Sequence, residues 1–315
     1  MSSIALLSFA FLIAAVCAAI MGYAIQRGAT CMVAAVEEVL TKRSGYRLLG
    51  LAEAAVWVAG GVLLWRILGG HETLPIGYPP TLLTVAGGLL LGLGAFVTRA
   101  CVFGAVARFG SGEWAYVLTP VGFFAGCATI WPLIGRFPEM HVASPLFDAV
   151  WLLVPFAIFV SWRLFEALRA GRARMFAAHV WTPHRATAVI GIMFAISLIA
   201  IGPWAYTYAL LALAQRKTDG VLIKFLLLFM LFAGALVGGW TAGRLKRVAP
   251  TREAVVRCFG GGVLMGWGSL LIPGGNDELL LVGIPLLQPY AWVAVASMAL
   301  AIGTGLTVQR RLGRR

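Results

Sequence analysis

The sequence is poor in charge, in acidic side chains and in histidine. Only 12% of its 315 residues are charged, against roughly a quarter in soluble domains, and 12 are aspartate or glutamate. It contains no GxxxxGK[ST] phosphate-binding loop and no CxxC pair among its five cysteines. A soluble fold, ATP coupling within this chain, a metal site and a disulfide framework are therefore not expected. We predict no cofactor and no enzymatic activity.

Apolar residues are present in excess. They make up 61% of the chain, and the mean hydropathy is +0.91. Apolar runs long enough to cross a bilayer recur throughout, which predicts an all-α polytopic membrane protein with about nine transmembrane helices. It would form a single integral membrane transport domain over residues 1–315. The expected spans lie near residues 4–25, 48–68, 82–97, 115–134, 147–166, 186–206, 222–243, 258–272 and 286–308.

Shorter apolar pieces lie between some of these spans. Residues 32–40, 102–109 and 278–284 are too short to cross a bilayer and suit re-entrant half-helices buried inside the protein. Residues 206–214 are ambiguous, so the number of elements in that part of the chain stays open.

The net charge of +13 comes mainly from lysine and arginine in the connectors. Such clusters act as topology signals, so we assign them to the cytoplasm and expect no nucleic-acid partner. With nine spans, a cytoplasmic C-terminus places the N-terminus in the periplasm. The connector at residues 71–80, which lacks lysine and arginine, then lies on the outer side too. The clusters fall within residues 42–47, 163–185, 244–257 and 310–315.

Three stretches of the sequence align without a gap. They read MGYAIQRGATCMVAAV from residue 21, LGLGAFVTRACVFGAV from residue 91 and MGWGSLLIPGGNDELL from residue 265. In each, a glycine precedes by nine residues the position held by Cys31, Cys101 or Gly275. We interpret them as internal repeats near residues 17–70, 87–135 and 258–308, the third inverted relative to the others, as in many transporters.

Each repeat contains a break after its glycine-rich helix, at RGATC, TRAC and PGGND. A short helix starting there would aim backbone N–H groups and the positive end of its dipole at one spot, which makes an anion site. The alternative is that the breaks are packing turns and the cysteines are small apolar fillers. The candidate substrate-binding residues are Cys31, Cys101, Gly28, Thr98, Arg99, Gly274, Gly275 and Asn276.

Charged residues near the breaks could act on the substrate or serve another purpose. Arg27 and Arg99 could attract an anion, but we favour an extended conformation that reaches the membrane interface. Asp277 and Glu278 are functional candidates because acidic groups at membrane depth are rare, yet they would repel an anion unless protonated or turned to an outer vestibule.

The segments GGLLLGLGAFVTRACVFGAVARFGSGE and GGVLMGWGSLLIPGGN resemble the YeeE/YedE sulfur-transport family of bacterial inner-membrane proteins. The resemblance covers most of the chain. It implies uptake of thiosulfate or a related sulfur anion through an hourglass-shaped helical bundle, in which cysteines contact the substrate sulfur in turn. It also implies a small cytoplasmic sulfur-carrier protein as a possible partner. The family usually has a Gly-Cys-Asn element in its second half, where this sequence has Gly275.

Three functions remain open at this stage. The first is an inner-membrane permease for a small sulfur-containing anion, above all thiosulfate. The second is a membrane sulfur-transfer component with a persulfide on Cys101, which needs an activating cation or base, and only Arg99 is near in sequence. The third is a permease for an unrelated small solute, with the cysteines incidental.

Overall fold

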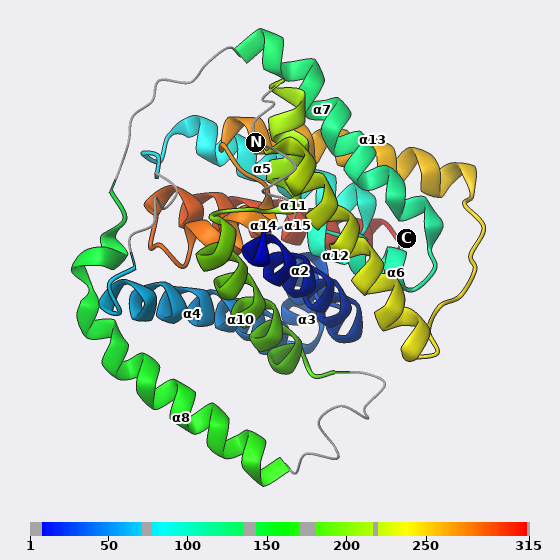
Figure 1. Ribbon diagram of the computed structural model, residues 1–315. Coiled ribbons are helices and arrows are strands. Elements are labelled where there is room, and N and C mark those ends of the chain that lie inside the picture. The colour runs from blue at the N-terminus through cyan, green and yellow to red at the C-terminus, as the bar shows by residue number, and fades with distance from the viewer. Residues whose placement is uncertain (1–7, 71–76, 135–142, 171–180, 217–219, 314–315) are drawn as a thin grey trace.

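The computed structural model describes residues 8–70, 77–134, 143–170, 181–216 and 220–313, which form a bundle of helices (Figure 1). The long helices are α2 (Phe9–Gly28), α4 (Tyr46–Ile67), α5 (Leu82–Thr98), α7 (Leu118–Ile134), α8 (Leu153–Ala170), α10 (Pro183–Ile201), α12 (Val221–Thr241), α13 (Arg252–Leu271) and α15 (Pro289–Leu312). The shorter ones are α3 (Met32–Lys42), α6 (Val102–Gly110), α11 (Tyr206–Ala214) and α14 (Asn276–Glu278), which continues into the π-turn η4 (Leu279–Gly283). Single 3-10 turns are η1 (Trp114–Val117), η2 (Pro145–Asp148) and η3 (Val150–Leu152).

Nine helices within the described residues are long and apolar enough to cross a membrane, which confirms the predicted fold class. Helix α13 begins before its expected span, at Arg252, because the side chain of Thr251 accepts a hydrogen bond from the Ala254 N–H and caps it. Part of the connector at 71–80 and parts of the basic clusters, at 171–180 and 314–315, lie outside the described residues. The orientation of the termini stays a prediction.

The long helices pack in two groups. In one, α2 lies between α12 and α10, and α10 also packs on α4. In the other, α13 lies between α7 and α5, and α5 also packs on α15. Glycines permit the close approach of α5 and α13: a Cβ added at Gly94 would lie 2.5 Å from the Gly261 carbonyl oxygen. The glycines in the aligned stretches thus have a packing role.

A long helix, a break and a short helix follow one another four times in the described chain. The units are α2 with α3, α5 with α6, α10 with α11, and α13 with α14. Their N-cap residues all have extended backbone and are Cys31, Cys101, Ala205 and Gly275. The sequence predicted three of these helix starts and left the one at Ala205 open. Inversion between repeats and re-entry from one membrane side stay predictions.

Helix α8 lies along one edge of the bundle, beside α4 (Figure 1). Its arginine Arg163 donates to both carboxylate oxygens of the buried Glu53 on α4, through Nε at 2.7 Å and through Nη2. His184 Nδ1 on α10 lies 2.6 Å from the same carboxylate. A buried polar cluster therefore joins this peripheral helix to the first group.

Candidate functional site

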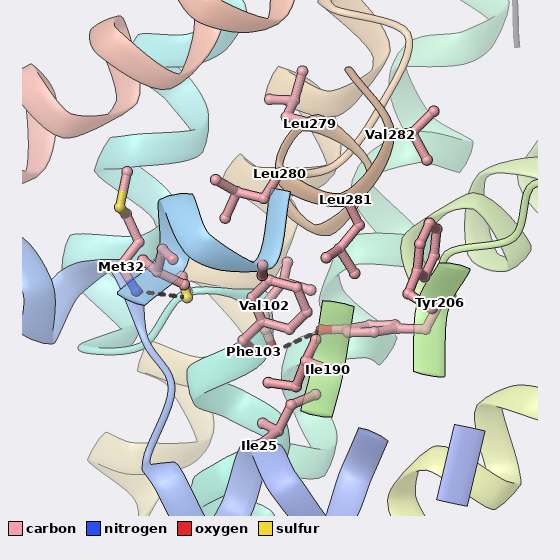
Figure 2. Close-up of a cluster of buried hydrophobic side chains, with 14 of the residues drawn as sticks. Ile25, Met32, Val102, Phe103, Ile190, Tyr206, Leu279, Leu280, Leu281 and Val282 are labelled. Carbon is pink, nitrogen blue, oxygen red and sulfur yellow. Dashed lines mark hydrogen bonds between the residues drawn. The ribbon is translucent and has the colours of Figure 1, made fainter. Parts of the chain in front are cut away.

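The N-termini of the short helices meet inside the bundle. The Met32 N–H at the start of α3 donates to the Cys101 sulfur at 3.1 Å, and the Val102 N–H at the start of α6 donates to Asn276 Oδ1 at 3.3 Å. Figure 2 shows the Met32 bond to sulfur among the surrounding apolar side chains. Three helix starts that are far apart in sequence are thus joined by direct hydrogen bonds.

Helix α11 joins the same centre. The Tyr206 hydroxyl donates to the Val102 carbonyl oxygen at 3.1 Å, a bond drawn in Figure 2. The Thr207 N–H donates to Asp277 Oδ2 at 3.2 Å, and its hydroxyl donates to the other carboxylate oxygen. All four short helices therefore contribute their first turn to one buried polar cluster, which we call the helix-tip site: Cys31, Met32, Cys101, Val102, Tyr206, Thr207, Gly275, Asn276 and Asp277.

The two predicted cysteines lie together where α3 and α6 meet. Cys101 is fully buried, whereas Cys31 is partly exposed. Gly104 on α6 lies against the Cys31 thiol, because a Cβ added at residue 104 would lie 2.5 Å from the Cys31 sulfur. A side chain at residue 104 would therefore require the thiol to move. The aligned cysteines are the N-cap residues of two helices that contact each other.

The third aligned position is filled differently. A Cβ added at Gly275 would lie 2.3 Å from Thr207 Oγ1. The Thr207 side chain, carried by α11, therefore occupies the space that a side chain at residue 275 would need. At this helix start a hydroxyl held by Asp277 stands in the place of a thiol.

Asn276 is the polar side chain at the centre of the helix-tip site. It is fully buried, and in the described part of the chain its Nδ2 has no hydrogen-bond partner. An unsatisfied buried donor carries a penalty of about 1–3 kcal/mol. A solute that accepts a hydrogen bond from Nδ2 would remove that penalty.

Two other predicted residues lie next to the helix-tip site. Gly28 and Cys31 line a pocket of about 10 Å³, together with Thr30, whose buried hydroxyl finds no partner among the described residues. Gly274 donates its N–H to the Ser269 carbonyl oxygen at 2.9 Å and so shapes the turn before α14. Gly28 and Gly274 therefore lie beside the site, in the backbone that leads into α3 and α14.

The remaining two predicted residues are not brought to the site. Thr98 is buried against α13, where a Cβ added at Gly261 would lie 2.0 Å from its hydroxyl oxygen. Arg99 has a left-handed backbone at the end of α5 and an exposed side chain. Arg27, at the end of α2, is 4% exposed and donates to Thr241 Oγ1 on α12 at 2.9 Å. Its place relative to the membrane interface stays a prediction.

The centre of the bundle is closed. A second pocket of about 10 Å³ is lined by Met21, Phe194 and Asp277 among others. Along α2 and α10, the buried Ile25 and Ile190 lie between this pocket and the one beside Cys31, and Figure 2 shows both side chains. Each pocket has room for about one water molecule.

Comparison with known proteins identifies the family of this chain. The sequence model of a family described as sulphur transport matches residues 27–304, most of the chain. The chain belongs to this family. It is also 24% identical to the thiosulfate transporter TsuA of Escherichia coli (strain K12), over 92% of each chain. Family membership confirms the resemblance seen in the glycine-rich segments and makes this a multi-pass membrane protein of sulfur transport.

Sequence reasoning missed Tyr206, Thr207 and Ala205 in the site. The apolar segment 206–214 was recognised as a separate ambiguous element, but no glycine register tied it to the other units. The pairing of Thr207 with Asp277 depends on residues 70 positions apart, so no local pattern could have found it.

Proposed function

We propose that the protein is a permease that carries thiosulfate across the bacterial inner membrane by way of the helix-tip site. The observation that carries the proposal is the bond from the Met32 N–H to the Cys101 sulfur. It supports the proposal because a helix N-terminus here already binds a sulfur acceptor inside the bundle. A solute with a terminal sulfur can replace the thiol as the acceptor of that N–H.

The other half of the site suits the opposite end of the same anion. Thiosulfate carries sulfur at one end and oxygens at the other. Asn276 Nδ2 offers a strong donor to an oxygen, and it is fully buried, where such a bond is strongest. Two thiols on one side and an amide on the other therefore favour an anion of mixed sulfur and oxygen character.

The position of Arg99, the one cation near Cys101 in sequence, does not favour the persulfide alternative. It needs a cation beside Cys101, and the candidate Arg99 is exposed and lines a surface hollow with Arg252 and Arg257. The small cytoplasmic sulfur-carrier protein expected from the resemblance stays a prediction.

The test is uptake of sulfur-labelled thiosulfate by cells that lack their own sulfate and thiosulfate importers. Cys101→Ser keeps an acceptor for the Met32 N–H but removes the polarisable sulfur that would contact the sulfur of the substrate. We expect uptake to fall roughly tenfold, which corresponds to about 1.4 kcal/mol. Membrane expression and melting temperature, measured in parallel, should stay close to those of the unchanged protein. Uptake of labelled sulfate by the wild type, measured in the same cells, tests whether the protein distinguishes thiosulfate from sulfate.

Failure to transport would overturn the proposal. If the unchanged protein is present in the membrane and takes up no thiosulfate, while a known thiosulfate transporter does so in the same cells, the solute is another compound. If Cys101→Ser transports normally, the cysteines are incidental fillers.

We also propose the topology with a periplasmic N-terminus and a cytoplasmic C-terminus, supported by the basic connectors. A reporter that fluoresces only in the cytoplasm should be bright when fused after residue 315. A dark fusion at normal expression would reverse the assignment.

A further inference from the structure

A hollow of about 780 Å³ lies where the ends of three helices converge. It is bounded by the C-terminal end of α5, the first turns of α13 and the C-terminal part of α15, through residues such as Arg99, Arg252 and Gln309. Its volume falls within the range of small-molecule pockets. It is separate from the helix-tip site, and the transport proposal does not use it.

One part of the hollow is basic. Arg99, Arg252 and Arg257 line it together with the single acid Glu253, so the formal charge of the lining is three minus one, or +2. Arg257 Nη1 lies 3.8 Å from Glu253 Oε1, which is a weak pairing because the Glu253 side chain is 80% exposed. Arg257 Nε is buried and has no hydrogen-bond partner among the described residues. The lining therefore carries an excess of positive charge that would attract an anion.

The other part of the hollow is apolar. Phe96 and Val97 line it from α5, and Val256 and Leu264 line it from α13. Gly260 lies between the latter two, and a Cβ added there would meet no atom within 4 Å. An open apolar surface thus continues along α13 from the arginines.

We propose that this hollow binds an anionic phospholipid, with the phosphate on the three arginines and an acyl chain along Val256, Gly260 and Leu264. Basic pockets between transmembrane helices on the cytoplasmic side recognise anionic headgroups, and the proposed topology places this hollow on that side. The positive end of the α13 dipole adds to the attraction. A free inorganic anion would use the arginines but would gain nothing from the apolar wall.

The test is retention of lipid by the purified full-length protein, measured by native mass spectrometry after reconstitution in mixed phosphatidylglycerol and phosphatidylethanolamine. The wild type should retain phosphatidylglycerol preferentially. Arg99→Gln, Arg252→Gln and Arg257→Gln combined should lower that retention by roughly fivefold for each arginine removed. The matched control combines Lys246→Gln, Arg247→Gln and Arg311→Gln, which removes three exposed cations that do not line the hollow and should change little.

A second variant separates a lipid from a free anion. Gly260→Leu places a Cβ in open space and fills part of the apolar wall, so phosphatidylglycerol retention should fall while the melting temperature is kept. Equal retention of both lipids, or equal loss in the control triple variant, would overturn the proposal. Displacement of the lipid by millimolar inorganic phosphate, with Gly260→Leu unaffected, would assign the site to a free anion instead. If the arginine triple variant fails to fold, Gly260→Leu alone decides.

Discussion

The helix-tip site has two halves with the same backbone and different chemistry. All four short helices begin from an extended N-cap, but the caps of α3 and α6 are cysteines while those of α11 and α14 are Ala205 and Gly275. On the second half the polar groups are oxygens and nitrogens from Thr207, Asn276 and Asp277. Both halves therefore share backbone N–H groups at the start of a helix, whereas only the half formed by α3 and α6 carries thiols.

The largest effect is expected from a charge placed on the half without sulfur. Asn276→Asp keeps an acceptor for the Val102 N–H but replaces the unpaired donor with a negative group. Like charges brought together in a buried site are unfavourable by several kcal/mol, so thiosulfate uptake should fall by roughly 100-fold or more at neutral pH. The initial uptake rate in importer-deficient cells measures it.

Asn276→Gln is the control for the change of charge, because it keeps the amide and only lengthens the side chain by one methylene group. It should retain more uptake than Asn276→Asp. If Asn276→Asp transports as well as the wild type, the anion does not pass the second half of the site.

A smaller effect is expected when the second half is given a cysteine. Gly275→Cys forces a Cβ to within 2.3 Å of Thr207 Oγ1. Overpacking of this kind destabilises proteins by about 1–3 kcal/mol, so the melting temperature of the purified protein should fall. Thr207→Gly in the same chain removes the obstructing side chain and keeps the Thr207 position's N–H for Asp277.

The double variant should therefore melt above Gly275→Cys alone, a non-additive result expected of residues in contact. Strict additivity of the two changes would show that Thr207 does not limit the size of residue 275. Uptake by the double variant then reports whether a third thiol helps transport.

The smallest effect is expected from a cysteine in neither half. Cys258 is buried in α13, in an apolar cluster with Ala100 and Tyr116, and does not start a short helix. Cys258→Ala should change thiosulfate uptake by less than about twofold, since it removes one small apolar group of the packing. A large loss of uptake at an unchanged melting temperature would show that Cys258 takes part in transport, as proposed for Cys31 and Cys101, and does not only fill space.

The sequence predicts the positions of the helices well and the contacts between side chains of different helices less well. Hydropathy places the nine long helices because each must bury or face lipid with an apolar surface over a fixed length. The aligned glycines place the helix starts at Cys31, Cys101 and Gly275 because close helix packing and a break leave a local trace in the sequence. These features depend on neighbouring residues only.

The rest depends on tertiary neighbours. Arg27 and Arg99 both lie close to a break, yet Arg27 is buried and donates to Thr241 on α12, whereas Arg99 is exposed at the end of α5. The fourth unit escaped a firm prediction because the segment from α10 to α11 is apolar on both sides of its break. Thr207 was missed because its role follows only from the empty position at Gly275.

Membranes store energy as gradients of protons and ions, and any continuous wet path through a transporter would dissipate them. The side chains of Ile25 and Ile190 separate two pockets that each hold about one water molecule. Water is unstable in a narrow apolar constriction. If the proposed path runs through these pockets, the resting conformation would hold no continuous chain of water molecules along it that could conduct protons.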